Sequence, residues 1–221
     1  MANQQEVLDS LAQIAKSLGN GHRLAIIERL AQADMSVDGL AKAFDLPIAN
    51  VSQHLQTLRH AGLVKATRSG KQKIYCLTDD RIVLVINLLR QIAEDNVAEV
   101  EKLVQRLFTD QDAEIQLDAV SREELLIGIQ NNQITLLDVR PQHEFEAGHL
   151  PEAINAPLDE LENLLMHLSK DSDIVAYCRG PYCALSHKAV AKLSRLGYRV
   201  RRFEEGFPEW KALGLPIERT I

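Results

Sequence analysis

Through the first 110 residues, apolar positions fall three and four residues apart, which is the spacing of helices that bury one face. Residues that begin and end helices mark the boundaries. Ser36 is a good N-cap, and Gly62 stands where a helix needs a C-terminal stop. Asp45-Leu46-Pro47 predicts a tight turn between two of the segments. The predicted helices are residues 7–18, 24–30, 37–44 and 48–61.

The pattern becomes strand-like after Gly62. Residues 63–67 and 73–77 are short runs with strand character, and Arg68-Ser69-Gly70-Lys71 between them suits a hairpin turn. A helix, a tight turn, a second helix and then a hairpin is the order of a winged helix-turn-helix, whose second helix enters the DNA major groove. The first half is therefore predicted to be a mainly α winged helix-turn-helix domain.

A long helix is predicted from Arg81 to Phe108, because its apolar residues repeat every seven positions. Two rows of such positions form a seam with a single polar member, as in a coiled coil. The length of this helix favours pairing with a second copy of the chain, so we expect a homodimer. The two rows are Ile82, Leu89, Asn96 and Leu103, and Ile86, Ala93, Val100 and Leu107.

Short apolar strands alternate with helical segments in the second half of the chain. This alternation predicts an α/β domain around a central, mainly parallel sheet. Residues 108–114 lose the apolar periodicity and gain acidic side chains, so a linker is predicted there, between domains 1–110 and 111–221. The predicted strands are residues 115–120, 134–139, 174–177 and 200–203, and the predicted helices are 121–129, 142–147, 159–168, 183–196 and 208–213.

Charge is distributed unevenly along the chain. The net charge is −6, and it lies entirely in the second half, because residues 1–110 hold 13 basic and 13 acidic residues and residues 111–221 hold 12 and 18. Residues 46–78 contain no Asp or Glu but five Lys and Arg residues. A basic window inside an acidic protein indicates a polyanionic partner, although an ordinary solvated face would have the same composition.

Several protein classes are excluded by composition. No apolar run approaches the roughly 18 residues that a membrane helix needs, and residues 1–9 lack the basic and apolar regions of a signal peptide. Three cysteines do not form a secreted disulfide scaffold. We therefore expect a cytoplasmic protein with reduced thiols and no membrane partner.

The second helix of the predicted helix-turn-helix carries polar side chains that suit DNA. Asn and Gln can pair with adenine edges, Ser and His can reach bases or phosphates, and basic side chains in the hairpin neutralise phosphates. The alternative is a small helical domain that binds protein. The candidate base contacts are Asn50, Ser52, Gln53 and His54, and the candidate phosphate contacts are Arg59, Arg68, Lys71 and Lys73.

The segments "LGNGHRLAIIERL", "VSQHLQTLRHAGLV" and "RSGKQKIYCL" resemble the ArsR-type winged-helix repressors, over about residues 5–108. The resemblance implies a dimer that binds double-stranded operator DNA and releases it when an inducer binds. Many of these repressors sense metals, but residues 36–44 hold no cysteine and residues 61–142 no histidine. Since a metal site needs clustered ligands, we predict none here, and we interpret Cys76 as an inert thiol.

Two of the cysteines lie together in "DIVAYCRGPYCALSHKAV". Cys178 ends a predicted strand and a helix begins about five residues later, which is where ligand sites gather in α/β sheets. Backbone N–H groups at a helix N-terminus, together with Arg179, would stabilise a thiolate. Cys178 is therefore a candidate nucleophile, although a buried cysteine at a strand end is the structural alternative.

Three segments, "LLDVRPQHEFEAGHLPEAINAPLDEL", "VAYCRGPYCALSHKAVAKLSRLGY" and "FEEGFPEWKALGLPI", resemble a rhodanese domain over about residues 115–221. The resemblance implies that Cys178 accepts a sulfane sulfur as a persulfide, held by the amides of the loop Arg179, Gly180, Pro181, Tyr182, Cys183 and Ala184. It implies mainly structural roles for Asp138, Arg140, Glu144, Gly148, His149, Asn155, Trp210 and Gly214, with Arg140 near the pocket. The loop that begins at Cys178 is shorter than that of the related phosphatases, which argues against phosphatase activity.

Cys183 departs from the rhodanese pattern, which commonly has a basic residue at this position. The change weakens the case for thiosulfate as donor and adds a second thiol. Cys183 could attack a persulfide on Cys178 and leave an internal disulfide, or the pair could hold a polysulfide. His187, one turn further on, is expected to face solvent. A zinc site from these three residues would lack a fourth ligand, so no metal and no cofactor is predicted.

The leading hypothesis is a DNA-binding repressor whose rhodanese-like domain accepts or senses reactive sulfur at Cys178 and Cys183, with sulfur donors or acceptors as small-molecule partners. An alternative is a rhodanese-type sulfurtransferase that passes thiosulfate or persulfide sulfur through Cys178 and uses the winged helix only as a tether. A third hypothesis is a repressor that responds to arsenite or another thiophilic inducer.

Overall fold

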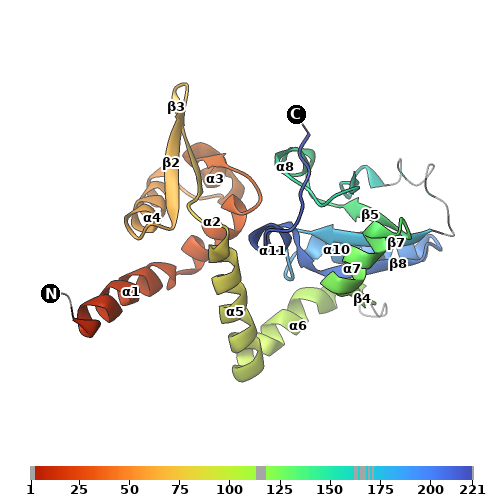
Figure 1. Ribbon diagram of the computed structural model, residues 1–221, viewed down its shortest axis with the longest axis horizontal. Coiled ribbons are helices and arrows are strands. Elements are labelled where there is room, and N and C mark those ends of the chain that lie inside the picture. Colours follow the sequence, from red (N-terminus) through yellow and green to blue (C-terminus); the bar gives the residue numbers. More distant parts are fainter. Residues whose placement is uncertain are drawn as a thin grey trace. The chain divides into compact units, whose positions relative to one another are not determined.

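The computed structural model describes residues 3–112, 118–161, 164, 168, 170 and 172–220. The chain forms two compact units, Met1–Ile86 and Asn87–Ile221, which are described separately (Figure 1). The division between Ile86 and Asn87 falls within the helix that follows the hairpin. The sequence had predicted a domain boundary between residues 110 and 111. Residues 108–112 of the predicted linker are helical instead, and only its residues 113–114 lie outside the described residues. Residues 115–117 of a predicted strand and half of the predicted helix at 159–168 also lie outside them.

The N-terminal unit contains the predicted helices and hairpin. Asn3 forms a capping box with Glu6, and the side chains of Asn20 and Ser36 cap the next helices. The elements are α1 (Gln4–Leu18), α2 (Gly21–Leu30), β1 (Met35–Ser36), α3 (Val37–Phe44), α4 (Ile48–His60), β2 (Val64–Ser69) and β3 (Gln72–Leu77). The sequence did not predict β1, which is only two residues long.

The helix-turn-helix of this unit is formed by α3 and α4. Asp45 ends α3 in the left-handed conformation, with φ of 51°, and Gly62 follows α4 with φ of +73°. Leu40 of α3 and Val51, Leu55 and Leu58 of α4 are fully buried. Their spacing leaves the opposite face of α4 exposed to solvent.

The hairpin completes a three-stranded antiparallel sheet in the order β1-β3-β2. Ser69 pairs with Gln72, so the turn consists of Gly70 and Lys71, and Gly70 supplies the positive φ (59°) that such a turn requires. The hairpin places Arg68 opposite Lys73 in an exposed basic wing.

The predicted helix from Arg81 to Phe108 is wrong as a continuous element. It consists of α5 (Arg81–Asn96) and α6 (Ala98–Asp112), with a break at Val97 (Figure 1). Its predicted seam does not exist as one surface either, because Ile82 and Ile86 are buried while Leu89 is exposed. The exposed apolar row of α5 is instead Val85, Leu88, Leu89 and Ile92.

The C-terminal unit is built on a five-stranded sheet in the order β4-β8-β7-β5-β6, with every neighbouring pair parallel. This confirms the predicted α/β class with a central parallel sheet. The strands are β4 (Ala119–Val120), β5 (Ile134–Asp138), β6 (Ile154–Asn155), β7 (Asp173–Cys178) and β8 (Val200–Gly206). The helices include α7 (Arg122–Gln130), α8 (Gln142–Ala147), α10 (Ala184–Arg195) and α11 (Phe207–Ala212).

Both faces of this sheet are covered, which explains why its central strands are apolar throughout. Along β7, Ile174, Ala176 and Cys178 belong to one buried cluster with α10, while Val175 and Tyr177 belong to the other with α7 and α11. The two-residue period of a strand accounts for this division. None of the helices in the described part of the chain is both long and apolar enough to cross a membrane.

Candidate functional site

The two cysteines of interest flank the turn between the central strand β7 and α10. Cys178 is the last residue of β7, and Cys183 is the N-cap of α10, which begins at Ala184. We call residues Cys178–Cys183 the sulfur loop. Because β7 lies between β5 and β8, the loop leaves the carboxyl edge of a parallel sheet near its centre.

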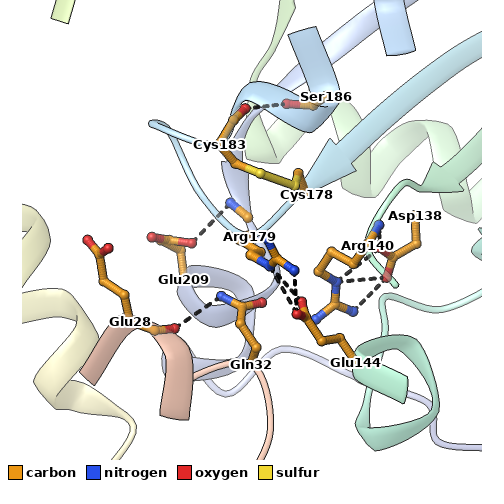
Figure 2. The surroundings of a disulfide bond; sticks show 11 residues. Glu28, Gln32, Asp138, Arg140, Glu144, Cys178, Arg179, Cys183, Ser186 and Glu209 are labelled. Carbon is orange, nitrogen blue, oxygen red and sulfur yellow. Dashed lines mark hydrogen bonds and ion pairs between the residues drawn. A yellow bond between two sulfur atoms is a disulfide. The ribbon is translucent and has the colours of Figure 1, made fainter. Parts of the chain in front are cut away.

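A disulfide joins Cys178 to Cys183 in the structure, with their Cα atoms 6.4 Å apart (Figure 2). Cys178 is 1% exposed and Cys183 is half-buried. The amide of Cys183 donates a hydrogen bond to the carbonyl of Gly180 at 3.1 Å, which closes a turn with Pro181 and Tyr182 at its corners. This amide therefore stabilises the turn, whereas the resemblance to a rhodanese implied that the loop amides would hold the sulfur.

The loop packs closely on the end of β8. A side chain at Gly206 would place its Cβ only 2.3 Å from the amide nitrogen of Gly180, so the two backbones can meet only if residue 206 is glycine. Gly180 itself has φ of +146° and lies against the carboxylate of Glu209. Glu209 also accepts a hydrogen bond from the Gly206 amide at 3.0 Å, and burial raises the pKa of Glu209.

Arg179 forms a bidentate ion pair with Glu144 from α8 (Figure 2). Its Nε and Nη2 atoms lie 3.0 Å and 2.6 Å from Oε1 of Glu144, whose side chain is 1% exposed. The positive charge beside Cys178 is therefore largely balanced by a carboxylate. A Cys178 thiolate would rely instead on the N-terminus of α10, where Cys183 makes no side-chain capping bond.

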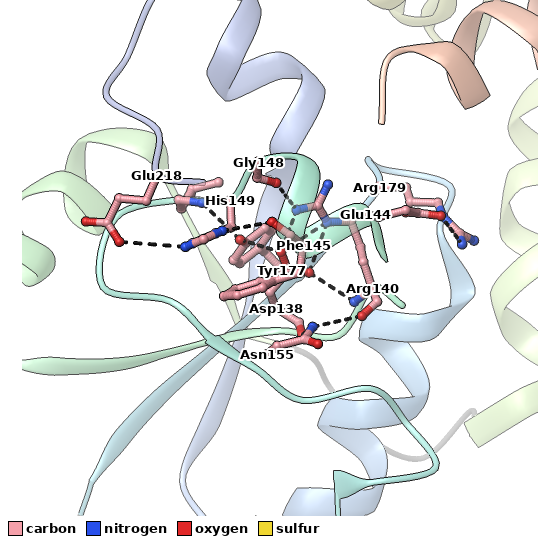
Figure 3. A network of polar contacts seen from close by, with 11 residues as sticks. Asp138, Arg140, Glu144, Phe145, Gly148, His149, Asn155, Tyr177, Arg179 and Glu218 are labelled. Atoms are coloured by element: carbon pink, nitrogen blue, oxygen red, sulfur yellow. Dashed lines mark hydrogen bonds and ion pairs between the residues drawn. The ribbon is translucent and has the colours of Figure 1, made fainter. Parts of the chain in front are cut away.

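A buried polar network supports the loop from the adjacent strand (Figure 3). Arg140, fully buried, binds both carboxylate oxygens of Asp138 and donates to the carbonyl of Gly148 at 2.7 Å. Tyr177 donates to Asp138 at 2.6 Å, and burial raises the pKa of Tyr177 well above its usual value. Asn155 ties the carbonyls of Asp138 and Arg140 together. These contacts position the backbone around the loop.

The other residues of the rhodanese-like segments also make structural contacts. His149 stacks on Phe145 and exchanges backbone hydrogen bonds with Glu218 (Figure 3). Trp210 is buried and donates to the carbonyl of Pro216 at 2.7 Å. Gly214 has φ of +72° in the turn that follows α11.

His187 does not face solvent as the sequence predicted. Its ring stacks on Phe108 of α6 with 4.0 Å between ring centroids. In the described part of the chain its buried Nε2 atom has no hydrogen-bond partner. Burial, with a smaller contribution from the charge of Arg202, lowers the pKa of His187 to about 4.

Within the C-terminal unit, α5 also contacts the sulfur loop, which the sequence did not predict. The Tyr182 hydroxyl donates to the carboxylate of Glu94, and the Arg90 guanidinium lies 4.4 Å from the centroid of the Tyr182 ring. Asn87 donates to Glu209 at 3.0 Å. The three α5 residues are spaced for one helix face, but nothing in the sequence connects that face to a loop some 90 positions away.

The predicted DNA-contacting residues lie on exposed parts of α4 and the wing. Asn50 and Gln53 are exposed, and Ser52 and His54 are half-buried. The ring of His54 lies 5.6 Å from that of His22, and burial, followed by the charges of His22 and Arg23, lowers the pKa of His54. The four basic candidates, Arg59, Arg68, Lys71 and Lys73, are all exposed.

Cys76 lies half-buried on β3. Among the described residues, no group of three or more His, Cys, Asp or Glu side chains is arranged to hold a metal ion.

A winged helix-turn-helix unit followed by a parallel α/β unit with a cysteine loop defines the class of the protein, and comparison with known proteins supports both parts. The helix-turn-helix domain family matches residues 18–66, and the rhodanese-like domain family matches residues 121–213. The HTH-type transcriptional regulator Rv0324 of Mycobacterium tuberculosis is 36% identical over 99% of this chain and 96% of its own length.

Two further proteins are similar to one half each. A sulfurtransferase of Allochromatium vinosum is 35% identical over 38% of this chain and 78% of its own. The solution structure of the homodimeric winged helix-turn-helix DNA-binding domain of Mb0332 from Mycobacterium bovis is 32% identical, covers 44% of this chain and 94% of that one, and has a TM-score of 0.40. The chain belongs to the ArsR-type winged-helix transcriptional regulators that carry a C-terminal rhodanese-like domain.

Proposed function

We propose that this protein is a DNA-binding transcriptional repressor whose affinity for its operator depends on the sulfur state of Cys178 and Cys183. The observation that carries the proposal is the disulfide within the sulfur loop, which joins Cys183 to Cys178, the residue that the resemblance to a rhodanese marks as the persulfide carrier. The Cα separation of 6.4 Å lies within the range in which disulfides form. Because the proposed target is operator DNA, we place this function in the cytoplasm.

DNA binding is assigned to α4 and the wing. Asn50 and Gln53 on the exposed face of α4 would read base edges in the major groove. Arg68, Lys71 and Lys73 of the wing would neutralise phosphates, and no acidic residue interrupts this segment between residues 46 and 78. The acidic second half of the chain would be repelled by DNA, which restricts the contact to this surface.

The sulfur chemistry proceeds in two balanced steps. The Cys178 thiolate attacks a sulfane sulfur of an inorganic polysulfide, an S–S bond of the donor breaks, and a shorter polysulfide leaves with the electron pair. The Cys183 thiolate then attacks the Sγ atom of the Cys178 persulfide, and the outer sulfur leaves as hydrosulfide. The two thiols lose two electrons in all, the transferred sulfur gains them, and the thiol protons pass to the solvent and the leaving sulfide.

The active form is proposed to be a homodimer. Two helices carry exposed apolar rows that suit an interface between copies of the chain. These rows are Val7, Leu8, Leu11 and Ile14 on α1, and Val85, Leu88, Leu89 and Ile92 on α5. A dimer would present two copies of α4 to a palindromic site.

A DNA-binding titration tests the proposal. Duplexes are first selected from a random-sequence library with the reduced and the disulfide forms of the protein. The affinity of the selected duplex is then measured for reduced, polysulfide-treated and arsenite-treated protein. We expect polysulfide to change the affinity at least threefold and to leave a Cys178–Cys183 disulfide or a sulfur adduct of about 32 Da at Cys178. Equal affinities for reduced and polysulfide-treated protein would contradict the proposal.

Three variants serve as controls. Cys178→Ser should abolish the polysulfide response, while Cys76→Ser, which removes the remaining thiol, should respond like the wild type. Gln53→Ala should lose sequence preference in both sulfur states, which shows that the signal reports base recognition.

A response to arsenite without one to polysulfide would assign the site to thiophilic inducers instead. Steady turnover of thiosulfate, lost in Cys178→Ser, together with unchanged DNA affinity would favour the sulfurtransferase alternative.

A further inference from the structure

Three side chains on one face of α5 lie against the sulfur loop and its support. Asn87, Arg90 and Glu94 are separated by three and four residues, so they project from the same side of the helix. We call these three residues the α5 stripe. It belongs to the same compact unit as the loop, and its side chains are half-buried, whereas Leu88, Leu89 and Ile92 on another face are exposed.

The first contact of the α5 stripe is with Tyr182. Glu94 accepts the hydrogen bond of the Tyr182 hydroxyl, and Arg90 lies over the face of the same ring. Both contacts depend on where the Tyr182 ring lies. The hydrogen bond to Glu94 depends on the direction of the O–H group, and the cation–π contact depends on the distance from Arg90 to the ring. A shift of Tyr182 of 1 Å or so would therefore weaken both contacts.

The second contact runs through Glu209. Asn87 donates to Glu209, and Arg90 donates to Asn87 at 3.0 Å, which links the residues of the stripe to one another. Glu209 in turn accepts a hydrogen bond from the amide of Gly206 and lies against Gly180. The stripe thus contacts the loop directly at Tyr182 and indirectly at Gly180.

Tyr182 is placed to move with Cys183. The hydrogen bond from the Cys183 amide to the Gly180 carbonyl makes residues 180–183 one turn, and Tyr182 directly precedes the cysteine. Two sulfur atoms are about 2 Å apart when bonded, whereas non-bonded heavy atoms keep about 3.5–4.0 Å. Opening the disulfide, or inserting a sulfane sulfur at Cys178, must therefore separate the two sulfur atoms, and we expect the turn that carries Tyr182 to take up part of this displacement.

The helix that carries the stripe continues into the N-terminal unit. The first turns of α5 contribute Ile82, Val83 and Ile86, all buried, and the unit boundary falls directly after Ile86. We propose that Asn87, Arg90 and Glu94 are positioning residues that read the state of the sulfur loop through Tyr182 and transmit it along α5 to the DNA-binding unit. This inference rests on the proposed function, because it assigns the route by which that site regulates DNA binding.

The test measures a coupling ratio, which is the Kd for the selected DNA duplex of the dithiol form divided by that of the disulfide form. Tyr182→Phe removes the hydroxyl that Glu94 binds, and Glu94→Gln removes the charge that binds it. We expect each variant to bring the coupling ratio at least threefold closer to one, while disulfide formation and the thermal unfolding midpoint of the reduced protein stay close to wild type. The double variant should be no closer to one than either single variant, since both remove the same contact.

Tyr198→Phe is the matched control, because it removes a tyrosine hydroxyl from the same unit at a position away from α5. It should keep the wild-type ratio. The inference is overturned if the wild-type ratio differs from one by at least threefold and both Tyr182→Phe and Glu94→Gln retain it. A wild-type ratio of one contradicts the proposed function itself, so the two failures are distinguishable. Asn87→Ala is a further test of the stripe, since it removes the contact with Glu209 and the hydrogen bond from Arg90 while it leaves Tyr182 and Glu94 in place.

Discussion

The carboxylate of Glu144 determines what Arg179 can do beside the sulfur loop. Its side chain is buried and holds the guanidinium through two parallel contacts. The loop therefore offers less positive charge to a dianion such as thiosulfate than its sequence indicates. Together with Cys183, where rhodanese loops commonly carry a base, this charge balance argues against a loop that selects its sulfur donor mainly by positive charge, as a thiosulfate site would.

His187 makes the stability of the C-terminal unit depend on pH. Its pKa is lowered to about 4 in the folded protein by burial and by Arg202, whereas an unfolded His titrates near 6.5. Between these two values the unfolded chain binds more protons than the folded one, so the free energy of unfolding falls as the pH drops from 6.5 towards 4 and is fully restored above 6.5.

Urea unfolding at pH 7.5 and pH 5 checks this expectation. The urea midpoint of the wild type should fall more between the two pH values than that of His187→Gln, which has no titrating group there. His143→Gln is the control, because His143 is on the surface, with 69% of its side chain exposed. Equal losses in the wild type and in His187→Gln would show that His187 contributes nothing to the acid sensitivity.

At the scale of single residues, the sequence predicted where a residue lies in a strand or helix better than which side chain it contacts. The placement of Cys178 at a strand end and Cys183 at a helix start followed from local pattern alone. The pairs Arg179–Glu144, His187–Phe108 and Tyr182–Glu94 were not predictable, because they join residues 35, 79 and 88 positions apart. Only the packing of whole helices determines such pairs.

Among the elements, α5 has different roles along its length. Its first turns bury Ile82, Val83 and Ile86, and its later turns carry the α5 stripe on the same side, since Val83 and Asn87 are four residues apart. Another face exposes Leu88, Leu89 and Ile92. The heptad pattern that predicted one long helix joined the buried Ile82 and Ile86 to the exposed Leu89 in a single seam, and it included no residue of the α5 stripe. Period alone cannot separate apolar residues that serve a domain's own core from those that remain for a partner, and the break at Val97 has no local signal such as Pro or Gly.

Replacing Leu88 and Ile92 tests the dimer proposal. Both side chains are about 60% exposed, so Leu88→Glu with Ile92→Glu should leave the fold intact. The two changes should weaken dimerisation by about 3 kcal/mol or more for each protomer, because two apolar side chains would no longer be buried in the interface. Sedimentation velocity at micromolar concentration should show a dimer for the wild type and a monomer for the double variant. Gln91→Glu, an added charge on the same helix, should remain dimeric.

A wild-type protein that sediments as a monomer at these concentrations would contradict the proposed assembly. A double variant that stays dimeric would instead place the interface away from this row, for example on the exposed apolar row of α1.

For the whole molecule, the two units could be assigned from sequence because each carries its own local pattern. The bounds of the wing hairpin and of the apolar strands at 134–138 and 173–178 were predicted to within a residue or two. The division of α5 between the units was not, since a helix that belongs to two units looks like any other helix in sequence. This shared helix is the feature that makes communication between sulfur chemistry and DNA binding physically reasonable.

The central claim is a coupling between the sulfur loop and DNA binding, and such coupling is reciprocal. The most direct measurement is the dithiol–disulfide equilibrium of Cys178 and Cys183 in a glutathione redox buffer, with and without saturating DNA, followed by alkylation and mass spectrometry. DNA should shift the midpoint potential by about 30 mV for each tenfold difference between the DNA affinities of the two forms. A midpoint potential that is the same with and without DNA would contradict the account.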